Sequence, residues 1–143
     1  MNALYLGGRL AAGVLLASFG VSAGASPDPI KLPNGVEIRV LAPGRTPAAY
    51  PAPTDTVKVH YEGSLENGQV FDSSYTRKEP ATLPLSRVIP CWTQGLQQIP
   101  VGAKATLRCP PATAYGERGA GGGLIPPGAT LTFRVELIDI VGR

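Results

Sequence analysis

Few of the side chains on which enzyme chemistry usually depends occur in this sequence. Its 143 residues include one histidine, two cysteines and one tryptophan. A zinc site takes three or four nitrogen, sulfur or carboxylate ligands, and one histidine beside one possible cysteine pair does not supply them. The glycine-rich stretch 119–123 lacks the Gly-Lys-Ser/Thr ending of a phosphate-binding loop. We therefore expect neither a metal site nor a cofactor.

Strong charge of either sign is also lacking. Lys and Arg number 13 against 10 Asp and Glu, which leaves a formal net charge of +3. No run of basic residues reaches the density of a nucleic-acid-binding patch, so nucleic acid is not an expected partner. Apolar residues make up 43% of the chain, an ordinary share for a globular core, and the length favours one domain.

The first 25 residues have the pattern of a signal peptide. Arg9 is the only charge among the first 27 residues, and it precedes an apolar run over residues 10–19. Small residues at 23–25 suit cleavage after Ala25 or, as the alternative, after Ala23. An uncleaved membrane anchor is the other reading, although the run is short for a span of about 20 residues. The pattern predicts an exported protein, periplasmic or secreted, with no stable membrane association after cleavage.

Export also bears on the two cysteines, Cys91 and Cys109. An even number of cysteines in an oxidising compartment is typical of a disulfide. The alternative is a pair of unpaired buried thiols, because the sequence alone does not establish the Cα separation that a bridge requires. We expect the bridge.

Alternating apolar and polar residues predict a series of strands. The alternation covers 36–40, 57–61 and 131–137, and shorter strands are expected at 70–71, 82–85 and 103–109. Pro90–Gln98 is the best helix candidate, because proline suits a first turn and Trp92 and Leu96 fall on one face. Residues 73–81 and 119–123 are expected to be loops. The pattern indicates an α+β fold, an antiparallel twisted β-sheet wrapped around one short α-helix. Residues 26–54 would supply the first strand and a proline-rich connection, and residues 55–143 the core.

Five short sequence motifs with aromatic and apolar residues follow one another along the chain. They are Val59-His60-Tyr61-Glu62-Gly63, Phe71-Asp72-Ser73-Ser74, Val88-Ile89-Pro90-Cys91-Trp92, Ala114-Tyr115-Gly116 and the stretch from Ile125 to Phe133. With this combination the chain resembles the FKBP-type (immunophilin) peptidyl-prolyl cis-trans isomerases over roughly residues 32–141. The resemblance implies an enzyme that accelerates rotation about X–Pro bonds in folding proteins. It would bind the twisted amide in a dry aromatic cleft, without metal or cofactor.

The resemblance also assigns roles to individual residues. Trp92 matches the tryptophan of the pocket floor, and the Ile89 backbone N–H and the Tyr115 hydroxyl would bind substrate carbonyls. The expected catalytic set is Tyr61, Phe71, Asp72, Ile89, Trp92, Tyr115 and Phe133. The expected substrate-binding set is Arg77, Leu83, Val88, Ala114, Leu124 and Ile125, with Arg77 as the partner of Asp72. From the residues alone, the alternative for Asp72 is a turn cap, and the alternative for Arg77 is a solvated surface charge.

Ala81 and Leu83 stand where the best-studied members of the family have aromatic residues. This departure looks similar to bacterial envelope members, including the Mip-like group, and bears on substrate preference. It keeps open a rival function, a non-catalytic module or chaperone that binds proline-containing segments in the same cleft. A disulfide-stabilised scaffold without a ligand is a third reading. Expected partners are proline-containing unfolded or partly folded proteins and macrolide inhibitors such as rapamycin, and the protein is expected to be a monomer.

Overall fold

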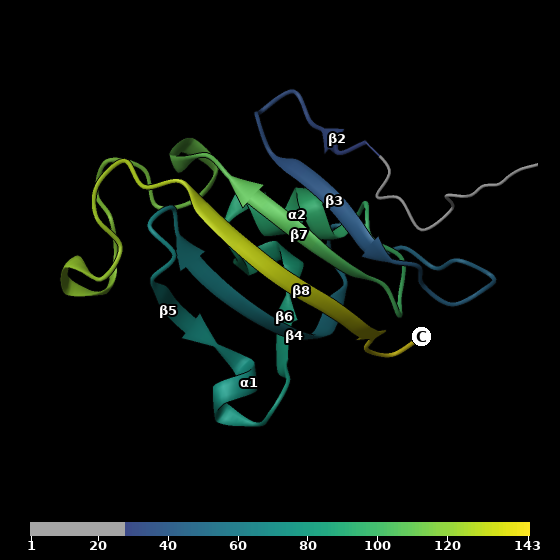
Figure 1. The fold of residues 1–143 in the computed structure, drawn as a ribbon. Coiled ribbons are helices and arrows are strands. Elements are labelled where there is room, and N and C mark those ends of the chain that lie inside the picture. The colour runs from purple at the N-terminus through teal and green to yellow at the C-terminus, as the bar shows by residue number, and fades with distance from the viewer. Residues whose placement is uncertain (1–27) are drawn as a thin grey trace, which may run out of the picture.

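A computed structural model describes residues 28–143, so the predicted signal peptide lies outside the described residues (Figure 1). The strands are β2 (Ile30–Lys31), β3 (Glu37–Ala42), β4 (Thr56–Leu65), β5 (Val70–Ser73), β6 (Ala81–Pro84), β7 (Lys104–Cys109) and β8 (Leu131–Ile140). The helices are α1 (Ser74–Arg77) and α2 (Pro90–Leu96), with single 3-10 turns η2 (Leu85–Arg87), η3 (Pro111–Thr113) and η4 (Gly121–Gly123). In this part of the chain, no helix has the length and apolar character needed to cross a membrane.

The strands form one antiparallel sheet in the order β2-β3-β7-β8-β4-β5, with β6 also paired to β4. The two longest strands, β4 and β8, pair from Val57 with Ile140 to Leu65 with Leu131. The other edge of β4 is shared, because its first half pairs with β6 and its second half with β5. Two strands that follow one another in the chain, β5 and β6, therefore lie along the same edge of β4.

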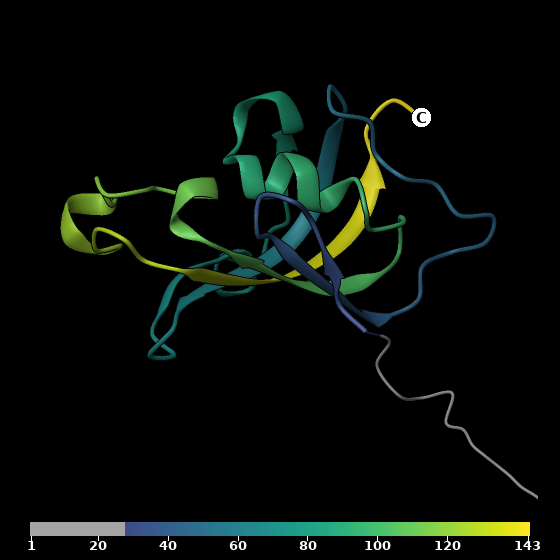
Figure 2. The same ribbon diagram turned by 90° about the horizontal axis from the view of Figure 1, so that it is seen from above.

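The apolar core lies between the sheet and α2. The odd-numbered residues of 131–137 on β8 are buried and the even-numbered ones are more exposed, which is the period of a half-covered strand. Figure 2 shows α2 lying over one face of the curved sheet. The helix approaches β7 closely at Gly95, because a Cβ atom there would lie 2.9 Å from Leu107 Cδ2. The predicted α+β fold, a sheet wrapped around one main short helix, is confirmed.

The expectation that residues 73–81 are all loop is wrong. Ser74–Arg77 form the helix α1, which Ser73 caps by accepting a hydrogen bond from the Thr76 N–H. The helix ends at Lys78, whose φ of 59° is left-handed. A helix of one turn is too short to show an apolar periodicity in the sequence. The helix α1 is stabilised by the Ser73 cap and by the buried Ser74. The Ser74 hydroxyl lies 2.7 Å from the Tyr61 backbone nitrogen and accepts its hydrogen bond.

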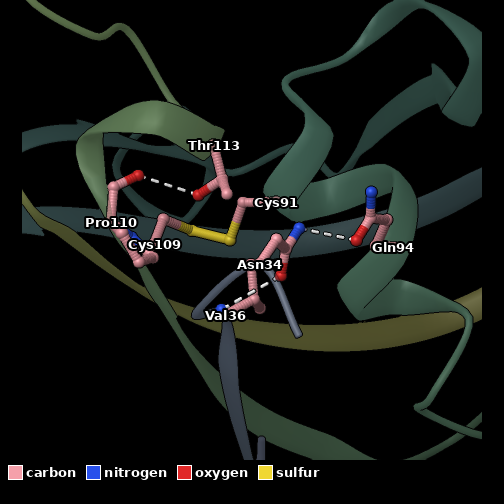
Figure 3. The surroundings of a disulfide bond; sticks show 7 residues. All are labelled: Asn34, Val36, Cys91, Gln94, Cys109, Pro110 and Thr113. Carbon is pink, nitrogen blue, oxygen red and sulfur yellow. Dashed lines mark hydrogen bonds between the residues drawn. A yellow bond between two sulfur atoms is a disulfide. The ribbon is translucent and has the colours of Figure 1, made fainter. Parts of the chain in front are cut away.

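A disulfide joins α2 to the end of β7 (Figure 3). Cys91 and Cys109 are bonded with their Cα atoms 5.6 Å apart, so the predicted pairing is confirmed. Both cysteines are fully buried. Beside the bridge, the Asn34 amide donates a hydrogen bond of 2.6 Å to the Gln94 side chain, which ties the turn before β3 to α2 (Figure 3). The first turn of α2, which carries Trp92, is thereby attached to the sheet covalently.

Loss of this disulfide is expected to destabilise the fold by about 3 kcal/mol, because closing an 18-residue loop restricts the unfolded chain. For a domain of this size the melting temperature should fall by roughly 10 °C. Circular dichroism melts of the oxidised protein and of protein unfolded and refolded in reductant measure the difference. A Cys91→Ala/Cys109→Ala variant is the control, since its melt must not respond to reductant. Identical melts of the natural protein in both states would contradict a stabilising bridge.

Candidate functional site

A cleft of about 430 Å³ lies where β4, β5, β6 and β8 meet the start of α2. Its volume falls in the range of roughly 300–1,000 Å³ that ligand pockets usually have. The lining residues are Tyr61, Phe71, Asp72, Leu83, Arg87, Val88, Ile89, Trp92, Tyr115 and Phe133. The structure therefore brings together all seven residues of the predicted catalytic set, and adds two of the predicted substrate-binding set, Leu83 and Val88. Their roles in binding and catalysis stay predictions.

Four aromatic rings form the floor and the adjoining walls of the cleft. Trp92 and Phe133 are each 4% exposed, and their ring centroids lie 5.3 Å apart at an interplanar angle of 88°. Tyr61 meets Trp92 at 5.0 Å and 88°, and Phe71 meets Phe133 at 5.7 Å and 84°. Such edge-to-face contacts are the geometry that aromatic pairs prefer. The rings come from β4, β5, β8 and α2, so the floor exists only when the helix is docked.

Gly63 makes room for two of these rings. A Cβ atom at this buried position of β4 would lie 2.6 Å from Phe71 Cζ and 2.7 Å from Phe133 Cε1. Contacts that short do not occur, so any larger side chain would push both rings out of place. The sequence shows a glycine inside a strand, which suggests a close approach. Only the structure shows that the approaching atoms belong to the cleft.

A hydrogen-bonded network closes one wall of the cleft. The Tyr61 hydroxyl donates to Asp72 Oδ2 at 2.5 Å and accepts a bond of 3.0 Å from an Arg77 guanidinium nitrogen. A second Arg77 nitrogen lies 2.5 Å from Asp72 Oδ1. The guanidinium carbon also lies 5.7 Å from the centre of the Tyr61 ring. Asp72 and Arg77 thus neutralise each other, and together they hold the Tyr61 ring in the wall.

The network shifts the acidity of its members. Partial burial raises the pKa of the Asp72 carboxyl, but the hydrogen bonds from Tyr61 and Arg77 outweigh it, so the pKa lies below its ordinary value. Burial and the bond to Asp72 raise the pKa of the Tyr61 hydroxyl. The contact with Asp72 raises the pKa of the Arg77 guanidinium. At neutral pH the carboxylate and the guanidinium are both charged, and the tyrosine is neutral.

Two hydrogen-bond donors at the rim are free to meet a ligand. The Ile89 backbone N–H, at the start of α2, donates to no other group in residues 28–143. The Tyr115 side chain is 39% exposed, and its hydroxyl makes no hydrogen bond in the described part of the chain. The Trp92 indole nitrogen is buried and likewise has no partner among the described residues. The cleft therefore pairs an apolar floor with a few unsatisfied donors.

Four residues of the predicted substrate-binding set do not line the cleft. Arg77 acts on it through Asp72 and Tyr61, Ala114 packs partly buried against the core, and Ile125 is buried at 6% exposure. Leu124 is 45% exposed on the loop between β7 and β8 that projects beyond the sheet (Figure 1). Their part in substrate binding stays a prediction.

Conversely, Arg87 lines the cleft and was missed by the sequence analysis. A single exposed arginine in a loop-like segment carries no pattern that marks it. The nearest available signal is its position directly before Val88 and Ile89. No cluster of three or more metal-ligating side chains occurs among residues 28–143.

Comparison with known proteins connects this cleft to a family. Residues 48–138 match the FKBP-type peptidyl-prolyl cis-trans isomerase family. The chain is 51% identical over 108 residues to the FKBP-type 22 kDa peptidyl-prolyl cis-trans isomerase of Escherichia coli. The aligned region covers 76% of this chain and 51% of that protein. It is 47% identical over 107 residues to the isomerase FkpA of the same organism, covering 75% of this chain and 38% of FkpA. The chain thus spans about half or less of the length of these curated relatives.

Solved structures agree with this assignment. The crystal structure of FkpA from E. coli superposes with a TM-score of 0.73 at 42% identity, covering 83% of this chain and 52% of that one. A peptidyl-prolyl cis-trans isomerase from Pseudomonas syringae gives a TM-score of 0.72 at 40% identity, with coverage of 81% and 83%. At these identities the likeness extends beyond the fold to the sequence.

Gly63→Ala is expected to destabilise the protein by about 1–3 kcal/mol, because the added methyl group displaces Phe71 and Phe133. The displaced rings should also change the fluorescence of Trp92, the single tryptophan of the chain. Urea unfolding and emission spectra of the folded state measure the two effects. Ser64→Ala, one residue further along β4, adds no atom and removes only a 3.4 Å hydrogen bond to the Thr132 carbonyl, so it is the control for the emission spectrum. An unchanged spectrum and midpoint for Gly63→Ala would show that the rings tolerate the extra carbon.

The Asp72–Arg77 pair predicts a pH-dependent contribution to stability. Because the folded-state pKa of Asp72 lies below its unfolded value, the contribution is complete above about pH 4 and disappears as the pH falls through the lower folded-state pKa. The pair is partly exposed, so we expect less than about 1 kcal/mol. Urea unfolding of the natural protein and of Asp72→Asn, from pH 7 to pH 2.5, measures it. Asp139→Asn, which breaks a looser pair of 3.9 Å with Arg45, is the control. A difference that persists undiminished at the lowest pH would contradict this account.

Proposed function

This chain belongs to the FKBP-type peptidyl-prolyl cis-trans isomerase family, and from that premise we propose that it catalyses cis-trans isomerisation of X–Pro peptide bonds. The observation that carries the proposal is the cleft, which combines an aromatic floor around Trp92 with unpaired donors at the rim. No nucleophile, metal or general base is required, because no bond is made or broken in the reaction. The residues that line the cleft suit this chemistry.

The barrier to rotation is about 18–20 kcal/mol, since amide resonance must be lost on the way. The twisted amide carries less charge on its carbonyl oxygen than the planar one, so water favours the planar form. A floor from which water is excluded removes that advantage and binds the twisted state better, which is the condition for catalysis. Lowering the barrier by about 4 kcal/mol accelerates rotation about a thousandfold. Trp92 and Phe133, nearly fully buried, supply such a floor for the proline ring.

The rim donors would hold the substrate backbone. The Ile89 N–H and the Tyr115 hydroxyl can each donate to a carbonyl oxygen, and neither must break an existing bond to do so. The Asp72–Arg77 pair hydrogen-bonds to the Tyr61 hydroxyl and thereby holds the Tyr61 ring in contact with the bound proline. Arg77 is accordingly a positioning residue in this proposal. The contributions of Ala114, Leu124 and Ile125 would come through the loop that carries Tyr115.

The substrates we propose are proline-containing proteins that are unfolded or partly folded after export. Uncatalysed proline isomerisation takes tens of seconds or longer, so it can limit folding where no other isomerase acts. Export rests on the signal-peptide pattern of the first 25 residues, and the Cys91–Cys109 disulfide supports it, because disulfides persist in oxidising compartments. We further propose that the protein acts as a monomer and that macrolides such as rapamycin occupy the cleft. Relation to the Mip-like group stays a prediction.

A non-catalytic module that only holds proline segments is the second candidate. Leu83 favours it, because this aliphatic side chain lines the cleft where the best-studied relatives have an aromatic wall. Binding without turnover would need a floor that grips the planar and twisted amides equally well.

The test is the cis-to-trans relaxation of Ala-Xaa-Pro-Phe peptides, with Xaa varied, in the presence of the purified protein. We expect acceleration that rapamycin abolishes. Tyr115→Phe should lower kcat/KM about two- to tenfold, as expected for the loss of one hydrogen bond to a neutral group. The Asp139→Asn variant, far along β8, controls for the effects of handling and should leave the rate unchanged.

Folded protein that accelerates none of these peptides would exclude the isomerase. In that case, rapamycin-dependent quenching of Trp92 would favour the binding module, because the cleft would still accept a proline mimic. An unchanged kcat/KM in Tyr115→Phe would remove the hydroxyl from the site.

A further inference from the structure

The charges in and beside the cleft do not balance. Asp72 and Arg87 both line it, but Asp72 is paired with Arg77 at 2.5 Å and with the Tyr61 hydroxyl. Arg87 has no such partner. Its side chain takes part in none of the ion pairs or hydrogen bonds found in residues 28–143. One positive charge is therefore left over at the mouth of an otherwise apolar site.

The sequence around Arg87 offers nothing that would neutralise it locally. No aspartate or glutamate occurs between Glu79 and Glu117, so the segments β6, η2, α2 and β7 contain no acidic residue. Arg87 is the only charged residue in this stretch before Lys104. The wall of the cleft that these segments build is consequently positive.

The backbone that carries Arg87 is held firmly. Arg87 ends the 3-10 turn η2, whose first residue Leu85 is fully buried. The Leu85 N–H donates to the Asp55 carbonyl at 2.9 Å, and the Leu85 carbonyl accepts a bond of 2.6 Å from the Thr93 hydroxyl on α2. The turn is thus fastened to the sheet on one side and to α2 on the other. This anchoring holds the Arg87 backbone directly before Val88 and Ile89, and all three residues line the cleft.

We propose that Arg87 determines substrate specificity: the cleft selects proline segments that carry an aspartate or glutamate next to the proline. This inference rests on the proposed isomerase function and names a substrate class for it. A guanidinium offers a planar set of donors that matches a carboxylate, and an arginine without a partner gives up no existing bond to bind one. Because the side chain is exposed, the gain is modest and sensitive to salt.

The experiment compares kcat/KM for two peptide series, Ala-Xaa-Pro-Phe and Ala-Ala-Pro-Xaa, with Xaa as Glu, Gln or Lys. Exchange measured by NMR serves both series, since it needs no chromogenic group. At low salt we expect Glu to exceed Gln by about two- to fivefold in at least one series, and Lys to fall below Gln. Both differences should shrink in about 1 M salt, where charges are screened beyond roughly 3 Å.

Substitutions of Arg87 test whether this side chain causes the preference for acidic peptides. Arg87→Gln should bring the kcat/KM values of the Glu and Lys peptides together. Arg87→Glu should reverse the preference, and Arg87→Lys should retain most of it. Arg134→Gln is the matched control, because it removes the same charge from a residue that alternates away from the core on β8. The ratio of kcat/KM for Glu peptides to kcat/KM for Lys peptides should be the same in Arg134→Gln as in the natural protein.

The outcomes separate the two proposals. Equal kcat/KM for Glu, Gln and Lys in both series, from protein that accelerates the Gln peptides, would overturn the role of Arg87 and leave the isomerase intact. A charge preference that survives Arg87→Gln would overturn it as well. Folded protein without activity on any peptide would overturn the isomerase and this inference together.

Discussion

The docking of one short helix against a curved sheet is the constraint on which the rest of this structure depends. α2 has seven residues, too few to be stable alone, so its contacts must hold it. Gly95 lets it lie directly on Leu107 of β7, and the Cys91–Cys109 bridge attaches its first turn to the end of the same strand. Trp92 is consequently fixed between rings from β4 and β8, where it serves both as core and as cleft floor.

The site divides into groups that are already satisfied and groups that are not. One group is the network of Tyr61, Asp72 and Arg77, whose side chains hydrogen-bond to one another. This network forms a wall of the cleft and leaves few donors or acceptors for a ligand. The Ile89 N–H, the Tyr115 hydroxyl and the Arg87 guanidinium are left without partners in the described residues. Recognition of backbone and charge is therefore concentrated at the rim, whereas the floor contributes by excluding water. This separation allows substrate preference to vary without altering the floor.

Sequence patterns predicted most of the sheet because alternation with period two survives in half-buried strands such as β8. They failed where local structure depends on single contacts. The strand β2 has two residues and the helix α1 four, so neither has a periodicity to detect. Ser73 as a cap and Ser74 as a buried bridge to Tyr61 explain α1, but equally short serine-rich segments are more often loops.

By itself, the sequence determined the fold class, the candidate disulfide, and the aromatic motifs that indicate the family, because these depend on residue type and local order. Only the tertiary structure decided that Leu83, Val88 and Arg87 line the cleft while Ala114 and Ile125 do not. It also decided that the Asp72 carboxylate pairs with Arg77. The physical reason is that periodicity tells which face of an element is buried, whereas the pairing of β4 with β5, β6 and β8 sets which buried faces meet.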